Sequence, residues 1–500
     1  MTTKENAGRR ALVVGLGASG WASIQYLVRF GWSVAAADTR DAPPNAERVR
    51  KAYPDVELKL GAASLDPSLA EDIDLLVMSP GISPLTGAAA PLAARARALG
   101  VDVAGEIELF ARELLRLKAA TGYSPKIIGI TGTNGKTTTT TLTAKMVAAA
   151  GKSVIAAGNI GPNAVTELLK AEDAGALPDY WVLELSSFQL QTTASLACDS
   201  AALLNVTEDH IDWHGSMAMY FEAKKRIFGP RTVRVLNRDD SMSISCEAGA
   251  PAVRTFGASE PAHRGEWGLS EIDGLSWLSM MPALSDDDRA IAKADKRFEP
   301  QDELSATPLM PESALLIQGR HNAMNALAAL ALATSAGIGL DAALNALAHY
   351  KGEPHRVQKI RSVDGVDFID DSKGTNVGAV VAAVEGFAAQ KRRILIVLGG
   401  DGKGQDFSPL AAALKHRAAL AAVIGMDGEK IAKVLDAAAI PNVRSKTLEE
   451  AVEALWQAHR PGDVLLLSPA CASWDMFRDY AHRSAVFAGC AEQIAESLQR

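Results

Sequence analysis

The sequence has little cysteine, no long apolar run and no concentration of positive charge. Its four cysteines, Cys198, Cys246, Cys471 and Cys490, lie far apart and form no Cys-x-x-Cys pair, which indicates reduced structural thiols in a cytoplasmic protein. No apolar segment approaches the roughly 20 residues that span a bilayer, so we expect no membrane contact. The first residues, MTTKENAGRRALVVGLG, are not expected to be a signal peptide, because their short apolar stretch leads directly into a glycine loop.

Charge and length narrow the class of protein further. The net charge is −8 and there is no basic run or tail, which argues against a nucleic-acid partner. The charged fraction of 22% and the hydrophobic fraction of 48% are typical of a soluble globular protein. The 500 residues exceed what one core usually covers, so we expect about two to four domains.

Short apolar strands alternate with helices along most of the chain. RALVVG (10–15) and WSVAAAD (32–38) are predicted strands on either side of a helix at 18–30, and IDLLVMSPG (73–81) is the next strand. A helix near 105–117 is followed by a predicted linker, AATGYSP. The alternation predicts an α/β fold with mostly parallel sheets that helices cover on both faces. We expect three domains, at 1–117, 118–352 and 353–500.

Two later segments depart from this alternation. Between about 258 and 315 the sequence has mixed charge without a clear period, which predicts a surface excursion. The segment KIRSVDGVDFIDDS predicts a β-hairpin whose turn is Asp-Gly at 364–365.

The segment IIGITGTNGKTTTT predicts a strand, a phosphate-binding loop and a helix. Gly132 and Gly135 allow backbone N–H groups to converge on a phosphate, Lys136 supplies positive charge and Thr137 a hydroxyl for Mg²⁺. The spacing departs from GxxxxGK[ST], because Ile130 stands five residues before Gly135. An ordinary turn would explain the glycines but not the Lys-Thr-Thr at the helix start, so we predict an ATP-binding loop.

Candidate metal ligands follow two of the predicted strands. Glu184 lies near the carboxyl end of the apolar strand WVLEL, at the sheet edge where α/β proteins bind ligands. A metal would compensate its buried charge; a buried ion pair is the alternative. His210 follows another strand, beside Asp209, Asp212 and His214, and is a candidate ligand or a structural histidine.

The segment GLGASG predicts a second phosphate site near the N-terminus. It fits GxGxxG between a strand and a helix, and Asp38 ends the next strand, where a Rossmann domain binds a ribose. This pattern alone indicates an NAD enzyme. The glycines, however, predict only that a diphosphate binds at a helix N-terminus. A UDP-sugar also carries a diphosphate, so these residues do not distinguish NAD from a UDP-sugar.

Twelve short motifs occur in an order typical of one enzyme family. They are GLGASG, SPGI, GEIELF, TGTNGKTT, GNIG, LELSSFQL, NVTEDHIDWH, GRHNAMNALAAL, KGEPHR, DDSKGTN, GGDGKGQDF and SPACASWDMF. With these motifs the sequence resembles the Mur ligase family from about residue 10 to 490. LSSFQL and SPACASWDMF are similar to its glutamate-adding members in particular.

The resemblance implies an ATP-dependent amide ligase in cytoplasmic peptidoglycan precursor synthesis, which acts on small-molecule substrates and binds neither nucleic acid nor membrane. It would add D-glutamate to UDP-N-acetylmuramoyl-L-alanine through an acyl phosphate, as a monomer. A Rossmann-like first domain would bind the UDP substrate, the central P-loop domain ATP, and a Rossmann-like C-terminal domain the amino acid. The implied UDP-substrate contacts are Gly17, Ala18, Ser19, Gly20, Asp38, Thr39, Arg40, Asn159 and Ser186.

The resemblance also assigns the ATP and metal sites. Thr137 and Glu184 would hold one Mg²⁺, and His210 with a carbamylated lysine a second. Alignment on KRI places that lysine at Lys224, with Lys225 the alternative, although the sequence alone favours a surface lysine on an amphipathic helix. The implied catalytic residues are Lys136, Glu184, His210 and Lys224. The implied ATP contacts are Gly132, Thr133, Asn134, Gly135, Lys136, Thr137, Thr138, Asn325, Arg356 and Asp371.

The implied amino-acid site lies in the C-terminal third of the chain. Its lysines and hydroxyls suit a dianionic amino acid. The implied contacts are Lys373, Thr375, Lys403, Ser473, Trp474 and Tyr480. Two features depart from the family pattern: Trp474 stands where a smaller aliphatic residue is expected, and the 258–315 segment is longer than usual.

Three other functions account for parts of the sequence. An NAD-dependent oxidoreductase explains GLGASG and Asp38 but leaves TGTNGKTT and Glu184 unused. A regulatory ATP-binding protein explains the phosphate loop but not DDSKGTN and SPACAS in a third domain. A ligase similar to folylpolyglutamate synthase shares the loop and the glutamate, but it lacks a UDP-binding first domain.

Overall fold

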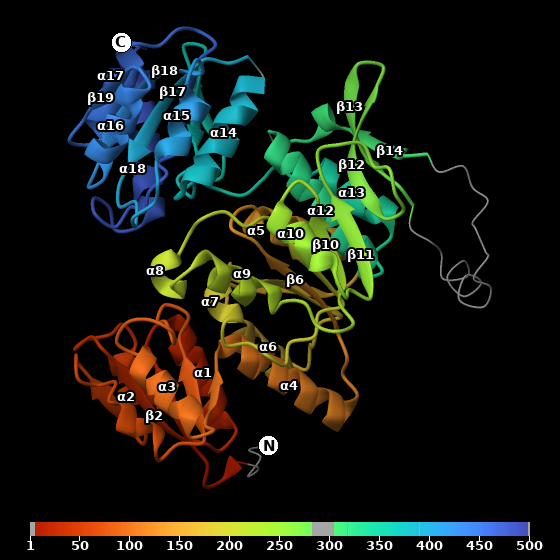
Figure 1. The fold of residues 1–500 in the computed structure, drawn as a ribbon, viewed down its shortest axis with the longest axis vertical. Helices are drawn as coiled ribbons and strands as arrows, with labels where there is room; N and C mark the ends of the chain where they lie inside the picture. Colours follow the sequence, from red (N-terminus) through yellow and green to blue (C-terminus); the bar gives the residue numbers. More distant parts are fainter. Residues whose placement is uncertain (1–5, 283–304, 318, 390, 499–500) are drawn as a thin grey trace. The chain divides into compact units, whose positions relative to one another are not determined.

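Three β-sheets, each flanked by helices, make up the protein in a computed structural model (Figure 1). The structure describes residues 6–282, 305–317, 319–389 and 391–498. The described chain forms two compact units, of which one holds the first two sheets and the other the third. Most strand pairs are parallel, which confirms the predicted α/β class. Among the described residues, none of the helices combines the length and the apolar character needed to cross a membrane.

The first sheet has five parallel strands in the order β3-β2-β1-β4-β5. β1 and α1 are joined by the GLGASG loop, and Gly20 lies where the helix approaches the strand: a Cβ there would be 1.8 Å from the Gly15 carbonyl oxygen. Only glycine permits this contact. The elements are β1 (Arg10–Val14), α1 (Ala18–Arg29), β2 (Ser33–Asp38), α2 (Ala46–Ala52), β3 (Glu57–Leu60), β4 (Leu75–Met78), α3 (Ala90–Ala98) and β5 (Asp102–Ala104).

The second sheet has nine strands in the order β14-β13-β12-β11-β10-β9-β6-β8-β7. Its strands are β6 (Lys126–Thr131), β7 (Val154–Gly158), β8 (Tyr180–Glu184), β9 (Ser200–Leu203), β10 (Val233–Asn237), β11 (Ala252–Phe256), β12 (Glu266–Ile272), β13 (Leu275–Met280) and β14 (Thr307–Pro311). The helices of this part of the chain are α4 (Glu106–Thr121), α5 (Lys136–Ala149), α6 (Ala164–Asp173), α7 (Ser187–Leu190), α8 (Ile211–His214), α9 (Met217–Lys225), α10 (Ser241–Ile244), α12 (Arg320–Ser335) and α13 (Leu340–Ala348).

The third sheet has six strands in the order β15-β16-β20-β17-β18-β19, and only its β15–β16 hairpin is antiparallel among the described pairs. The strands are β15 (Gln358–Val363), β16 (Val366–Asp370), β17 (Ile394–Gly399), β18 (Ala418–Ile424), β19 (Asn442–Arg444) and β20 (Val464–Leu467). The helices are α14 (Val377–Ala389), α15 (Ser408–Leu414), α16 (Gly428–Ala437), α17 (Leu448–Gln457) and α18 (Tyr480–Ser497).

The structure confirms one local prediction and corrects two. The Asp-Gly turn at 364–365 joins β15 to β16 as expected. The predicted linker after residue 117 is wrong in part, because α4 continues to Thr121 and ends at Gly122 in a left-handed conformation. The predicted excursion at 258–315 instead contains the antiparallel β12–β13 pair and β14, and its residues 283–304 lie outside the described residues.

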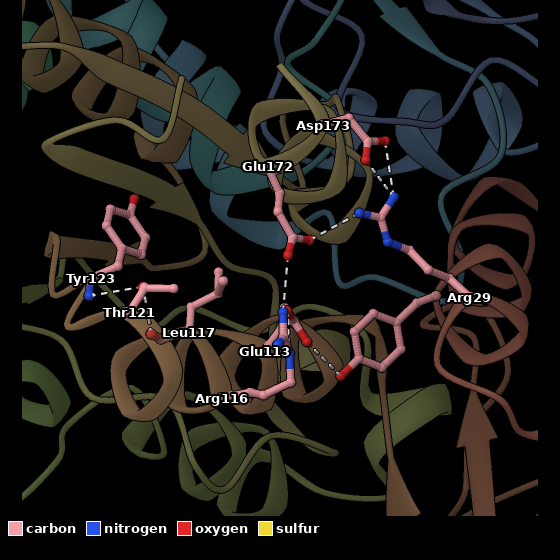
Figure 2. A network of polar contacts seen from close by, with 9 residues as sticks. Arg29, Glu113, Arg116, Leu117, Thr121, Tyr123, Glu172 and Asp173 are labelled. Atoms are coloured by element: carbon pink, nitrogen blue, oxygen red, sulfur yellow. Dashed lines mark hydrogen bonds and ion pairs between the residues drawn. The ribbon is translucent and has the colours of Figure 1, made fainter. Parts of the chain in front are cut away.

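Helix α4 joins the first two sheets into one core. Phe110 of α4 packs edge-on against Trp181 of β8, with ring centroids 5.0 Å apart. Beside this contact, Tyr26 of α1 donates to Glu113. Glu172 of α6 accepts from Arg29 through one carboxylate oxygen and from Arg116 through the other (Figure 2). Helices α1, α4 and α6 are therefore connected both by apolar packing and by ion pairs.

Two carboxylates at the start of α4 bind backbone amides of the second sheet's connections. Glu106 is buried and accepts from the Val165 amide at the start of α6, at 2.7 Å. Glu108 accepts from the Ala194 and Ser195 amides at 2.7 and 2.8 Å. Burial raises the pKa of Glu106 to about 7, although its hydrogen bonds to backbone amides act in the opposite direction.

Substituting Glu106→Gln is expected to stabilise the protein at pH 8 more than at pH 5. Because the pKa of Glu106 is higher in the folded state, its protonation favours folding below about pH 4.5, and this contribution is lost as the pH rises to about 7. The amide keeps an acceptor for Val165 and never ionises, so up to about 3 kcal/mol is regained at high pH. Thermal unfolding midpoints of both proteins at the two pH values test this; a difference that does not grow with pH contradicts it.

Candidate functional site

The GTNGKTT segment forms a tight loop between β6 and α5. Gly132 has a φ of 156°, and a Cβ there would be 2.9 Å from the Leu204 side chain, while Gly135 has a φ of 85°. Both positions therefore require glycine. Lys136 donates to the carbonyls of Gly132 and Thr133, each at 2.8 Å, which holds its ammonium over the loop. Thr137 and Thr138, in the first turn of α5, are buried. The loop and helix start thus have the form of an anion-binding N-terminus.

Two residues that the sequence analysis missed fix this loop. Asn205, just after β9, accepts from the Asn134 amide at 2.8 Å through its side chain and donates back to the Asn134 carbonyl at 3.1 Å. Tyr220 of α9 bonds to the Thr133 hydroxyl at 3.0 Å. Asn205 follows a predicted strand and could have been suspected, whereas nothing in the sequence singles out Tyr220.

Glu184 lies at the end of β8 and is buried, as its apolar strand predicted. Its Oε1 accepts from the Asn159 side chain at 2.7 Å, and its Oε2 is buried with no hydrogen-bond partner in the structure. A buried carboxylate oxygen without a donor suits a bound cation. The described residues contain no group of three or more His, Cys, Asp or Glu side chains placed to hold a metal. A cation here would therefore need other ligands, such as the Thr137 hydroxyl.

Lys224 is not the surface lysine that the helical pattern favours. It is 1% exposed, donates to the Gly132 carbonyl at 2.8 Å and lies 4.5 Å from the Tyr220 ring centroid. Its neighbour Lys225 instead forms an ion pair with Glu222 on the helix surface. Burying a lysine costs free energy unless its charge is compensated or has a function. Of the two lysines, Lys224 is therefore the better candidate for a functional role.

His210 has a left-handed backbone conformation, with a φ of 56°, at the start of α8. Its ring is 4.6 Å from the ring of Phe188, which also stacks on Trp213. His214, one turn further on, is fully buried and bonds to the Ser187 hydroxyl at 2.9 Å. Burial, with the charges of His210 and Lys224, lowers the pKa of His214 to about 4, so it is neutral at physiological pH.

A cavity of about 660 Å³ opens beside the GLGASG loop. Asn159 and Ser186 reach it from the ends of β7 and β8, so it lies between the first and second sheets. Gly20 is not among the lining residues, and its close approach to Gly15 gives it a packing role instead. The predicted UDP-substrate residues that do line the cavity are Gly17, Ala18, Ser19, Asp38, Thr39, Arg40, Asn159 and Ser186.

The carboxylate of Asp38 accepts hydrogen bonds from within the protein and has none left to accept from a ribose. Its two oxygens accept from the Leu16 amide and from the amide, Nε and Nη2 of Arg40, at 2.7–3.0 Å. Four hydrogen bonds use the whole acceptor capacity of a carboxylate. Burial opposes ionisation, but the bonds from Arg40 and Leu16 outweigh it and lower the pKa of Asp38. Asp38 therefore orients Arg40 beside the cavity.

The predicted amino-acid residues gather at one edge of the third sheet. Lys373 and Thr375 follow β16, Lys403 follows β17, and Ser473 follows β20, three neighbouring parallel strands. The ammonium of Lys373 lies 5.1 Å from the Tyr480 ring centroid.

The residues at this edge of the third sheet differ in their exposure to solvent. Ser473 is buried, Lys403 is exposed and Trp474 is 72% exposed. Asp371 is buried, accepts from Ser468 at 2.6 Å and from the Val357 amide at 3.3 Å, and burial raises its pKa to about 7.

The two remaining predicted ATP contacts lie near the start of the second compact unit. Asn325 of α12 is buried and donates to the Asn322 side chain at 3.2 Å. Arg356 precedes β15, and its charge lowers the pKa of Asp371 against the effect of burial. Both residues belong to the unit that holds the third sheet.

Three known family domains match most of the chain. Residues 9–105 match the Mur ligase MurD-like N-terminal domain, residues 130–333 the Mur ligase middle domain, and residues 355–471 the Mur ligase glutamate ligase domain. The matched ranges contain the glycine loop, the phosphate loop and, of the edge of the third sheet, Lys373, Thr375 and Lys403. The chain belongs to the Mur ligase family.

Individual relatives agree with this assignment. The chain is 49% identical over 495 residues to proteins of Burkholderia mallei (strain SAVP1) and Burkholderia pseudomallei (strain 1106a) named UDP-N-acetylmuramoylalanine–D-glutamate ligase, covering 97% of each chain. Among solved structures, it is similar to MurF ligase from Thermotoga maritima in complex with ADP (TM-score 0.57, 18% identity, 99% of this chain and 96% of that chain). It is also similar to UDP-N-acetylmuramate-alanine ligase from the same organism (TM-score 0.54, 19% identity, 97% and 99%). At these identities the structures support the fold alone.

Proposed function

We propose that this protein is the ATP-dependent ligase that adds D-glutamate to UDP-N-acetylmuramoyl-L-alanine in peptidoglycan precursor synthesis. The observation that carries the proposal is the hydrogen bond from Asn159 to Glu184, at 2.7 Å. It connects a residue that lines the cavity beside the GLGASG loop to a carboxylate on the strand next to the phosphate loop. This connection supports a UDP substrate bound beside the ATP phosphates, which transfer of a phosphoryl group to its carboxylate requires.

The proposed sites follow the predicted residues, within domains at 1–117, 118–352 and 353–500. ATP phosphates bind the loop from Gly132 to Thr138, and the UDP substrate binds the cavity beside Arg40 and Asn159. Lys373, Lys403 and Ser473 bind the glutamate carboxylates at the edge of the third sheet. Lysine and hydroxyl donors suit a dianionic amino acid better than a cationic one, which favours glutamate over lysine as substrate.

The reaction needs an activated acyl group, because an unactivated carboxylate is a poor electrophile. The alanyl carboxylate attacks the ATP γ-phosphate and ADP leaves, giving an acyl phosphate. The amine of D-glutamate then attacks the acyl carbon, and the tetrahedral intermediate releases inorganic phosphate and forms the amide. Lys136, which is held over the loop by the Gly132 and Thr133 carbonyls, stabilises the charge that develops on the transferred phosphoryl group.

The residues present fit Mg²⁺, and we propose two sites. Thr137 and Glu184 would hold one ion, since the buried Oε2 of Glu184 has no protein donor. His210 and Lys224 would hold the other, with Lys224 carrying a carbamate that converts its amine into an oxygen ligand. When bound, Mg²⁺ supplies charge neutralisation at the phosphates. Asn159 orients the Glu184 carboxylate by its hydrogen bond to Oε1.

Phosphate release from ATP by the purified protein tests the proposal. We expect release only when UDP-N-acetylmuramoyl-L-alanine and D-glutamate are both present, with L-glutamate and L-lysine as the comparison amino acids. Release with L-glutamate but not with D-glutamate would support the ligase reaction and contradict the proposed specificity for the D-enantiomer. No release with any of the three amino acids would contradict the proposed function.

A further inference from the structure

A second, smaller cavity is lined in part by the chain just after α7, and none of its lining residues belongs to the proposed substrate, ATP or metal sites. It has a volume of about 210 Å³, below the size of a typical pocket for a drug-sized ligand. Its lining comes from α3, β5, α4, the chain just after α7 and the C-terminal end of α9. Three arginines line it, Arg97, Arg112 and Arg226, but only two carboxylates, Asp102 and Glu108.

Both carboxylates are already paired with one of these arginines. Arg112 forms ion pairs with Asp102 at 2.6 Å and with Glu108 at 2.9 Å. Glu108 also accepts from the Ala194 amide and from the amide and hydroxyl of Ser195, at 2.6–2.8 Å. Arg112 and its two carboxylates together carry a net charge of −1, so the five side chains carry a net charge of +1, and neither carboxylate pairs directly with Arg97 or Arg226.

Arg97 and Arg226 form no ion pair with any residue that the structure describes. Arg97 donates only a long hydrogen bond, 3.4 Å, to the Pro84 carbonyl. Partial burial of its side chain lowers the pKa of Arg97, although the residue remains accessible to solvent, and the nearby charge of Arg226 lowers the pKa further. Each arginine lies at the C-terminal end of a helix, which favours a cation there. The helix ends do not explain why two like charges line the same cavity.

We propose that this cavity binds a small oxyanion of the phosphate class between Arg97 and Arg226. Guanidinium groups bind tetrahedral oxyanions through paired N–H donors, and a dianion would replace the repulsion between the two arginines by two attractions. Both residues are exposed, so a ligand can reach them from solvent. The site would connect α3 of the first sheet to α9, the helix that carries Lys224.

Calorimetric titration of inorganic phosphate into the full-length protein tests this proposal. Saturating ADP and Mg²⁺ are present to occupy the proposed nucleotide site, and ionic strength is held constant. We expect the wild type to bind phosphate, and Arg97→Gln and Arg226→Gln each to weaken binding about tenfold or more, because each removes a charged hydrogen bond. Arg231→Gln is the control, since Arg231 is an exposed arginine that lines a different groove.

Arg97→Glu supplies an independent readout. It places a carboxylate beside Arg226 and so substitutes for the anion. We expect a higher thermal unfolding midpoint without phosphate, and no further increase when phosphate is added. No phosphate binding by the wild type, or binding that survives both glutamine substitutions, overturns the proposal; the latter would locate phosphate beside ADP. These measurements involve no turnover, so their outcome is independent of the proposed ligase activity.

Discussion

Replacing Glu184 by glutamine is expected to lower turnover by roughly 10²- to 10³-fold without lowering the thermal unfolding midpoint. The amide oxygen still accepts from Asn159, so the local structure is retained. The substitution removes the negative charge and replaces Oε2, which is buried and has no donor, by an amide NH2 group. Removing an uncompensated buried charge does not destabilise a protein, whereas losing a cation ligand disables phosphoryl transfer. Steady-state phosphate release and differential scanning fluorimetry measure the two effects.

Glu106→Gln is the matched control for this substitution. It also neutralises a buried carboxylate, but one that binds the start of α6 and does not line the cavity beside the GLGASG loop. Its turnover is expected to match that of the wild type. If Glu184→Gln keeps full turnover, or loses stability in step with activity, Glu184 is a structural residue and the proposed metal site is wrong.

Replacing Lys224 by methionine is expected to lower turnover by roughly the same factor, on the order of 10²- to 10³-fold. Methionine keeps the apolar stem against Tyr220 but removes the group that holds the Gly132 carbonyl at 2.8 Å. Because the proposed carbamate forms from CO₂, wild-type turnover should also fall reversibly when CO₂ is removed. Steady-state phosphate release, with and without added bicarbonate, measures both effects.

Lys225→Met is the control, because Lys225 lies next in the sequence and pairs only with Glu222 on the surface. It should keep wild-type turnover and the same response to bicarbonate. A larger loss in Lys225→Met than in Lys224→Met would show that the alignment on KRI is shifted by one residue. Bicarbonate dependence that persists in Lys224→Met would contradict carbamylation at this position.

Sequence pattern predicted the elements that local rules determine. The strand, loop and helix around Lys136 follow from an apolar run, glycines and a lysine at fixed spacing. Glu184 could be predicted because a charge in an apolar strand is conspicuous. The amino-acid residues came from the resemblance to the Mur ligase family instead, and the sheet order places Lys373, Lys403 and Ser473 after three neighbouring strands.

Contacts between distant segments could not be predicted in this way. The burial of Lys224 depends on where α9 packs, and its own helix gives no sign of it. The bonds from Arg40 that use up the acceptors of Asp38 depend on how the chain turns after β2. The pairing of Asn205 with the loop joins residues 71 positions apart in sequence. Periodicity describes one element at a time, so it contains no information on such pairs.

The bonds of Glu106 and Glu108 also affect how the protein unfolds. If the first sheet separated while the second stayed folded, the amides of Val165, Ala194 and Ser195 would lose their acceptors. The large apolar contact of Phe110 with Trp181 would be exposed at the same time. Separating α4 from the second sheet would therefore cost these contacts together. We expect α4 to couple the unfolding of the two sheets, and a fragment that ends before Glu106 would lack this coupling.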